Sequence, residues 1–368
     1  MYYYYIFSLS VVFVTLSGME RRDCQFELNP LRKEYRSSLV NNNQKKDIEL
    51  NVVVEKPCVF CDQDSLKDND IISENKDDDV RVMLNKFPYF GLNQGIHFLV
   101  MPISHKEHLS DFCYTKLMNQ VKVIQQLNAK FDKDAYTLEY VLNLGILAGR
   151  SVSHLHGHLK VFTQPAMSLP ERIKWNNDNQ QITIEDAFAT VKAILESKDN
   201  VVQSFSSLIN PFDCECCTVT VTQSEKNDNH NWVIDRFEHN YVCLAHYPSL
   251  PAEIAIVPYS HVPSIKDLSL EALSENMALV KVLLGMLPKY VNEHIRECDG
   301  GNVYIKSMGY KMSSMEKKRF HVYTRLMPRT TISLTPGNFD NNSCKLDFNP
   351  LHLFDHLKKI NFKELIKD

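Results

Sequence analysis

The chain has 368 residues, of which 44% are hydrophobic and 23% are charged, and its formal net charge is −4 at neutral pH. The composition is typical of a folded globular protein, and the length suits two ordinary domains or one large double domain. The small net charge gives no reason to expect a nucleic-acid or membrane partner.

Residues 1–23 are predicted to be a leader outside the fold. Ile6 to Leu16 form an apolar stretch about as long as a signal-peptide core, but no basic residue precedes it and it is too short for a confident membrane span. Met19 begins a charged sequence and would serve as an alternative start. We therefore expect a cytoplasmic protein, with export through the leader as the less favoured alternative.

The ten cysteines are spaced too irregularly for a disulfide scaffold and are expected to be reduced thiols. Cys58 and Cys61 are separated by two residues, a spacing typical of one half of a metal site. Cys214, Cys216 and Cys217 could also bind metal, but no second cluster at a recognisable spacing accompanies them. Their role stays open at this stage.

Apolar stretches predict strands over 80–84, 96–101, 136–142 and 159–162. Between the second and third of these strands a helix is predicted over 110–131, because apolar residues recur there at helical spacing: Leu117, Val121, Ile124, Leu127 and Phe131. A second amphipathic helix is expected over 184–198.

The second half of the chain repeats this order. A strand at 254–257, a helix over 268–291 and strands at 303–305 and 320–326 are predicted, and Pro258-x-Ser-His261 follows its strand as Pro102-x-Ser-His105 does in the first half. This order indicates an internal repeat. We predict a catalytic half over 24–200, a degenerate second half over 201–345 and a tail segment over 346–368.

Three histidines, His154, His156 and His158, alternate with other residues where the chain enters the strand predicted at 159–162. Alternate side chains of an extended segment share one face, so the three imidazoles are expected to stand in a row. Gly145 and Gly149 precede them in a loop of small residues that would let phosphate oxygens reach backbone N–H groups. We expect His97 and His108 to have no part in this site.

A neutral histidine can attack phosphorus, because one ring nitrogen carries a lone pair while the other donates to a carbonyl that fixes the tautomer. Asn143, Ser151, His158 and the loop amides would stabilise charge on the phosphate oxygens. Metal ligation is the competing use of these residue types. Four of them could form a tetrahedral structural zinc site: Cys58, Cys61, His105 and His154.

The stretch Asn143-x-Gly-x-x-x-Gly149-x-Ser151-x-x-His154-x-His156 resembles the active-site motif of the galactose-1-phosphate uridylyltransferase family, within the histidine triad (HIT) superfamily. The resemblance covers roughly residues 26–330 and includes further segments in the family's order: Asn29-Pro-Leu31, Cys58-Val-Phe-Cys61, Asn85-Lys-Phe87-Pro88, Pro102-Ile-Ser-His105, Pro251-Ala-Glu253, Pro258-x-x-His261 and Asp267-Leu268.

The resemblance implies an α+β protein of two fused HIT-like halves, each an antiparallel sheet with packed helices. It implies that His156 is the nucleophile that becomes nucleotidylated and that the four residues named above hold structural zinc. Asn85 and Phe87 would lie near the base of a nucleotide, and Asn143, Gly149 and Ser151 near its phosphates.

The sequence departs from the family at three places. His158 stands where uridylyltransferases carry glutamine, and a third histidine is the pattern of HIT hydrolases and some dinucleoside polyphosphate phosphorylases. Asn41 to Gln44 replace the expected arginine-rich stretch. Tyr323 and Arg325 stand where a second metal site of some members has histidines.

We therefore predict a nucleotidyltransferase or phosphorylase that transfers a nucleoside monophosphate through a covalent nucleotidyl-His156. The substrate would be a nucleotide or nucleotide sugar, the acceptor would be phosphate or a sugar phosphate, and the protein would form a homodimer. The alternatives are a HIT-type nucleotide or dinucleoside polyphosphate hydrolase with water as acceptor, and an inactive zinc-stabilised nucleotide-binding protein.

Overall fold

A computed structural model describes residues 58–62, 66, 71–85, 87–88, 94–163, 184–196, 216–217, 232–245, 252–295, 298–330 and 350–366. Within them, ten strands form one sheet in the order β1-β2-β3-β5-β4-β9-β10-β8-β7-β6, and every neighbouring pair is antiparallel. Their bounds are β1 Ile71–Asn75, β2 Val80–Leu84, β3 Gly95–Met101, β4 Thr137–Leu144, β5 Gly157–Phe162, β6 Val233–Arg236, β7 Asn240–Leu244, β8 Ile254–Pro258, β9 Cys298–Met308 and β10 Thr324–Thr330.

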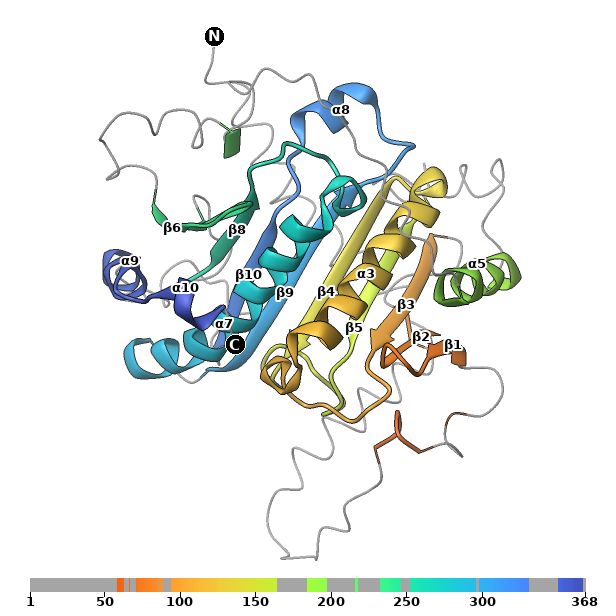
Figure 1. Cartoon of the computed structure of the whole chain (residues 1–368), viewed down its shortest axis with the longest axis horizontal. Helices are drawn as coiled ribbons and strands as arrows, with labels where there is room; N and C mark the ends of the chain where they lie inside the picture. Colours follow the sequence, from red (N-terminus) through yellow and green to blue (C-terminus); the bar gives the residue numbers. More distant parts are fainter. Residues whose placement is uncertain are drawn as a thin grey trace, which may run out of the picture.

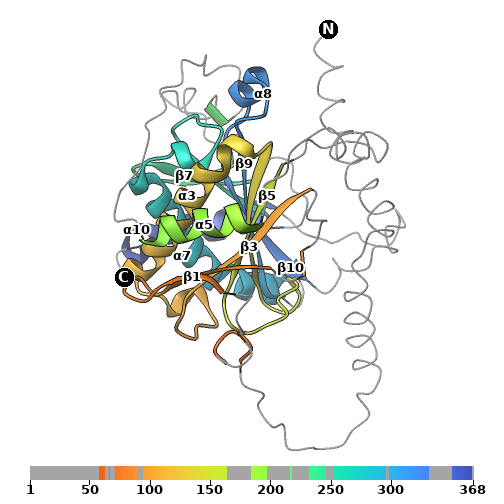
Figure 2. The same cartoon turned by 90° about the vertical axis from the view of Figure 1, so that its right-hand side faces the viewer.

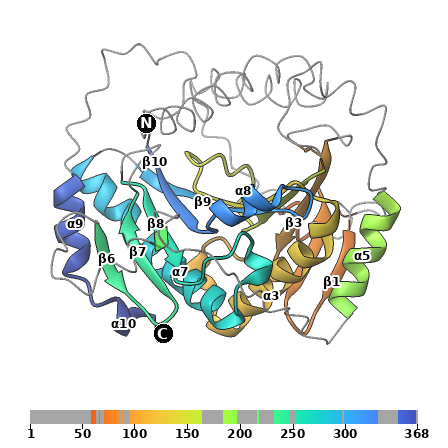
Figure 3. The same cartoon turned by 90° about the horizontal axis from the view of Figure 1, so that it is seen from above.

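Two long helices, α3 (Tyr114–Phe131) and α7 (Leu270–His294), lie side by side across one face of the sheet (Figure 1). The sheet curves around them when it is seen from above (Figure 3). α5 (Ile184–Glu196) packs on β1 at one end of the sheet (Figure 2), and α9 (Pro350–Lys358) contacts β6 at the other. The short helices are α8 (Ser314–Arg319) and α10 (Phe362–Leu365).

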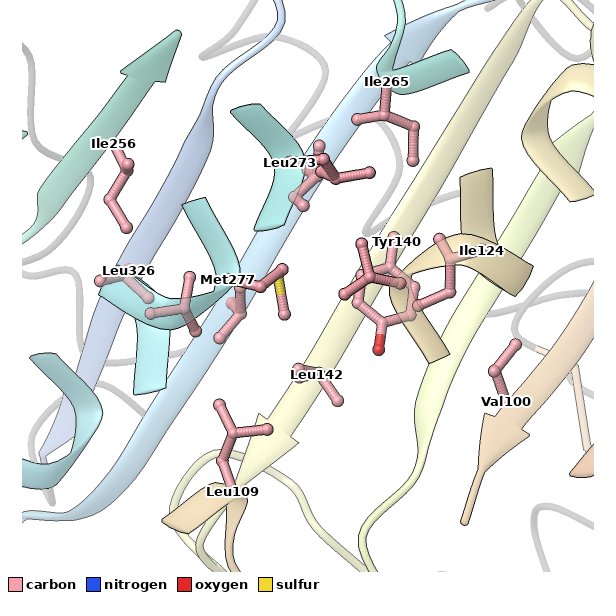
Figure 4. Close-up of a cluster of buried hydrophobic side chains, with 14 of the residues drawn as sticks. Val100, Leu109, Ile124, Tyr140, Leu142, Ile256, Ile265, Leu273, Met277 and Leu326 are labelled. Atoms are coloured by element: carbon pink, nitrogen blue, oxygen red, sulfur yellow. The ribbon is translucent and has the colours of Figure 1, made fainter. Parts of the chain in front are cut away.

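One hydrophobic core runs through both halves between the sheet and the two long helices. In Figure 4, Ile124 of α3 and Tyr140 of β4 belong to the same buried cluster as Met277 of α7 and Leu326 of β10. The helical spacing of apolar residues in α3 and α7 creates the stripe that packs on the sheet. Buried apolar surface of both halves therefore merges into a single core.

The predicted α+β class and its two HIT-like halves agree with this architecture. The succession β3, α3, β4, β5 in the first half is repeated as β8, α7, β9, β10 in the second. The halves join where β4 pairs with β9, from Thr137 opposite Met308 to Leu144 opposite Gly301. The half-boundary predicted at 200/201 and the tail boundary at 345/346 lie outside the described residues, as do the leader and Asn41 to Gln44.

Two predicted elements begin four residues later than expected. The strand predicted at 320–326 begins at Thr324, because Phe320 N–H caps α8 and Val322 N–H donates to Val262 in the β8–α7 connection. The helix predicted at 110–131 starts as a 3₁₀ turn and becomes α-helical only at Tyr114. Among the described residues no helix is long and apolar enough to cross a membrane.

Candidate active site

The loop after β4 turns sharply at two glycines. Gly145 and Gly149 have φ of 90° and 87°, in the left-handed region that favours glycine. The Gly149 N–H donates to Ile146 O at 2.9 Å, and the Arg150 N–H donates to Gly145 O at 3.2 Å. These bonds close a compact loop whose end, with the exposed Ser151, leads to the histidine row.

His156 is 6% exposed and lies immediately before β5. Its Nδ1 is 2.8 Å from the backbone oxygen of His154. A carbonyl can only accept, so Nδ1 carries the ring proton and the lone pair is on Nε2. Leu142 of β4 pairs with Gly157 of β5, which places Asn143 beside His156. The residue predicted to contact phosphate therefore neighbours the predicted nucleophile.

A chain of polar contacts reaches His158 from Asn85. Asn85 Oδ1 accepts from Phe87 N–H at 3.0 Å, so its amide nitrogen points to His97, where Nδ2 lies 3.2 Å from Nδ1 and 3.3 Å from Nε2. Nε2 of His97 is 3.0 Å from Nδ1 of His158. With Asn85 donating to Nδ1 of His97, the ring proton of His97 lies on Nε2 and points to Nδ1 of His158. The ring proton of His158 then lies on Nε2. The His158 ring centroid is 5.0 Å from that of His156.

His97 was expected to have no part in the site, yet the structure places its ring against His158. The signal that links them is strand alternation. Ile96 and Phe98 are buried in the core that α3 covers, so His97 points to the opposite face of the sheet, as His158 does.

The predicted metal ligands come together at the start of the row. The Sγ of Cys61 is 3.3 Å from Nδ1 of both His105 and His154, and the Sγ of Cys58 is 3.6 Å from Nδ1 of His154. A tetrahedral zinc ion would separate bound sulfur and nitrogen by about 3.5 Å. His154 Nε2 lies 3.0 Å from Pro102 O, which leaves the Nδ1 lone pair for a metal. This group could hold a metal ion.

Cys217 was named from the sequence as a residue that could bind metal, but the two histidines that join it in a second cluster were missed. The Sγ of Cys217 is 3.1 Å from Nδ1 of His261 and 3.6 Å from Nδ1 of His321. Nε2 of His321 lies 2.8 Å from Pro258 O, just as His154 meets Pro102 in the first half. These three residues could also hold a metal ion.

The signal for this cluster was present in the sequence. Cys214 and Cys217 repeat the two-residue separation of Cys58 and Cys61, and His261 ends the repeated Pro-x-Ser-His. Cys214 lies outside the described residues. The histidine that completes the cluster, His321, precedes β10 as His154 precedes β5.

Burial keeps the histidine row neutral. It lowers the pKa of His154 to about 4 and that of His158 to about 3, and it lowers the pKa of His156 as well. The guanidinium of Arg150 acts in the same direction on His156. An unprotonated ring is the form that can attack phosphorus.

The midpoint of the pH–rate profile for attack by His156 is therefore expected to lie below about 6.5, the usual pKa of histidine, because protonation is displaced to lower pH. Arg150→Gln removes a repelling positive charge, so it is expected to raise the midpoint of this profile. Single-turnover rates across pH measure both effects. A native midpoint above the usual histidine value would contradict the assignment.

Comparisons with known proteins address the fold and the first half of the chain. Residues 67–161 match the family model of the HIT domain. An ADP-glucose phosphorylase from Arabidopsis thaliana, solved with bound ADP-glucose, has a TM-score of 0.56 at 18% identity over 84% of this chain and 93% of that one. A GalT-like protein from Arabidopsis thaliana gives 0.54 at 18% identity over 77% and 84%, and a uridylyltransferase gives 0.50 at 14% identity over 78% and 85%.

No curated protein matches the chain in sequence. The predicted resemblance is nevertheless confirmed: residues 67–161 match the HIT domain model, and the chain has the fold of the GalT-like proteins.

Proposed function

We propose that this chain, a HIT-domain protein with a GalT-like fold, is a nucleotidyltransferase or phosphorylase acting on a nucleoside diphosphate compound such as a nucleotide sugar. The observation that carries the proposal is the tautomer of His156, whose Nδ1 is held by the His154 carbonyl at 2.8 Å. That contact directs the lone pair of Nε2 away from the backbone, as a nucleophile requires.

The reaction has two balanced steps. Nε2 of His156 attacks the α-phosphorus, a nitrogen–phosphorus bond forms, and the bond from phosphorus to the bridging oxygen breaks with release of the remaining phosphate compound. An oxygen of the acceptor phosphate then attacks the same phosphorus, and the bond to nitrogen breaks. The nucleoside monophosphate leaves on the acceptor and the histidine returns to its neutral form.

Neighbouring donors would stabilise the transferring phosphate. The contacts from Asn85 through His97 favour an N–H at Nε2 of His158, on the ring next to His156. Asn143 and Ser151, with the amides of the glycine loop, would supply further donors. The named activities of the ADP-glucose phosphorylase and the uridylyltransferase support the same reaction class through the shared fold.

The experiment that tests the reaction class uses ADP-glucose and UDP-glucose, each with inorganic phosphate, with a hexose 1-phosphate, or with neither. A transferase releases product faster when an acceptor is present. The alternative is a HIT-type hydrolase, which the third histidine at 158 favours. Equal rates with water and with every acceptor would overturn the transferase proposal.

Zinc is the metal we propose for both clusters, in a structural role. The first offers two thiolates and two imidazoles, a set that fills all tetrahedral positions and leaves none for substrate. The second offers the thiolate of Cys217 and the imidazoles of His261 and His321. When bound, the first zinc would link Cys58 and Cys61 to His105 after β3 and to His154 before β5. The second would link Cys217 to His261 after β8 and to His321 before β10.

Metal analysis is therefore expected to find about two zinc ions per chain. Cys217→Ser should reduce this to about one, because it removes the thiol that contacts both His261 and His321. Cys243→Ser is the matched control, since Cys243 is a buried thiol outside both clusters. A native protein with one zinc that Cys217→Ser retains would exclude the second site.

A further inference from the structure

The side chain of Asn302 connects the second half of the protein to the active-site loop. Asn302 lies on β9 and is 5% exposed. Its Nδ2 donates to Asn143 Oδ1 at 2.7 Å and to the backbone oxygen of Ala148 at 3.0 Å. Its Oδ1 accepts a hydrogen bond from Nε of Arg329 on β10. Neither Asn302 nor Arg329 belongs to the motif that marks the site in the sequence.

These partners leave the amide of Asn302 only one orientation. An arginine can only donate and a carbonyl can only accept. Arg329 therefore requires Oδ1 of Asn302 on its side, and Ala148 O requires Nδ2 on the other side. Asn143 must then present Oδ1 to Asn302. As a result, Nδ2 is the end of the Asn143 amide that can donate to another group.

Sheet register places this amide beside the predicted nucleophile. On β4, Asn143 pairs with Asn302 of β9 on one side, and its neighbour Leu142 pairs with Gly157 of β5 on the other. His156 directly precedes Gly157. The order across the sheet is therefore His156, Asn143, Asn302, with Arg329 reaching Asn302 from the next strand, β10.

The sequence before Asn302 explains how β9 comes so close. A side chain at Gly300 would collide with the backbone oxygen of Leu144, so only glycine fits there. Asp299 accepts hydrogen bonds from the backbone N–H groups of Ile146, at 2.5 Å, and Leu147, at 3.2 Å. The second half thus holds both the first turn of the glycine loop and, through Asn302, the backbone at Ala148.

We propose that Asn302, oriented by Arg329, is a positioning residue that makes Asn143 a hydrogen-bond donor to the α-phosphate of a nucleotide at His156. The inference rests on the proposed function. It gives the degenerate half a role in the reaction: this half has lost the histidine row but supplies the contacts that set the polarity of the phosphate site.

Asn302→Asp tests this inference, because it keeps the side-chain shape and replaces the donor by an acceptor. Arg329 would still have a partner, whereas the backbone oxygen of Ala148 would lose its donor. Asn143 would turn its Nδ2 toward the new carboxylate and present oxygen to phosphate. We expect nucleotidyl-His156 to form at least about tenfold more slowly at saturating ADP-glucose or UDP-glucose, the cost of losing a hydrogen bond to a charged group. If Asn302 acts through Asn143, adding Asn302→Asp to Asn143→Ala slows adduct formation no further.

Two further variants separate positioning from general structural damage. Arg329→Lys retains a donor for Asn302 and is expected to stay within about threefold of the native rate, well under the tenfold loss expected for a lost charged hydrogen bond. Asn276→Asp makes the same substitution at a buried amide of α7 that donates to Asn240 and accepts from Thr324, away from the glycine loop, and should leave the rate unchanged. Thermal unfolding of every variant monitors the fold.

The outcomes are decisive in each case. If the native protein forms the adduct and Asn302→Asp matches its rate while Asn143→Ala is slow, the positioning role is wrong. If the native protein binds these nucleotides without forming an adduct, the covalent mechanism fails, and Asn302→Asp must then weaken binding or the inference fails too. If the native protein does neither with either nucleotide sugar, the proposed function and this inference both fall.

Discussion

His156→Ala is expected to reduce nucleotidyl transfer by at least about ten-thousand-fold, which is typical for removal of a catalytic nucleophile. Alanine has no lone pair to attack phosphorus, and no other histidine of the row can replace it. Nδ1 of His154 faces the cysteines, and Nδ1 of His158 faces His97. Steady-state turnover of ADP-glucose or UDP-glucose with inorganic phosphate measures the loss.

The matched control is His108→Ala, the same substitution at an exposed histidine of the first half. It should leave turnover at the native level. If His156→Ala kept more than about a tenth of native turnover, less than 1.4 kcal/mol of transition-state stabilisation would depend on the imidazole, and a covalent mechanism through His156 would be excluded.

Cys61→Ser is expected to release one metal ion and to lower the midpoint of thermal unfolding by at least about 5 °C, because metal-binding energy contributes directly to folding. The Cys61 thiol is the group that contacts both histidines of the first cluster, each at 3.3 Å. Metal content and a thermal unfolding curve measure the two effects. Cys113→Ser, at an exposed cysteine before α3, is the control that should keep both metals.

The same variant should also slow the chemistry. The backbone oxygen of His154 fixes the tautomer of His156, and the ring of His154 belongs to the cluster that could hold a metal ion. Loss of the metal would loosen the ring of His154 and, with it, the hydrogen bond that fixes the tautomer of His156. A metal-free native protein, or a Cys61→Ser variant with native metal content and stability, would contradict the structural role of the cluster.

Much of the fold could be predicted from the sequence because its signals are local. The strand predicted at 80–84 has those bounds, and helix α7 follows from apolar spacing over 268–291. The order of elements revealed the repeat. The strand predicted from Phe320 was wrong at its start, because apolar character does not show that Val322 bonds the β8–α7 connection instead of a neighbouring strand.

The site was predictable where its residues are close in sequence. Alternation identified His154, His156 and His158, and their chemical roles stay predictions. The contributions that were missed depend on long-range pairing. His97 of β3 contacts His158 of the neighbouring strand β5. Asn302 contacts Asn143 only because β4 pairs with β9 at one particular register. The residues of the second cluster lie up to 104 residues apart.

The most direct test of the covalent mechanism is the intact mass of the native protein after brief exposure to ADP-glucose or UDP-glucose without acceptor. A nucleotidyl increment is expected, stable in base, lost in acid, discharged by inorganic phosphate or a hexose 1-phosphate, and absent from His156→Ala. A native protein that turns over either compound without ever showing the increment, or that shows it equally in His156→Ala, would contradict the mechanism.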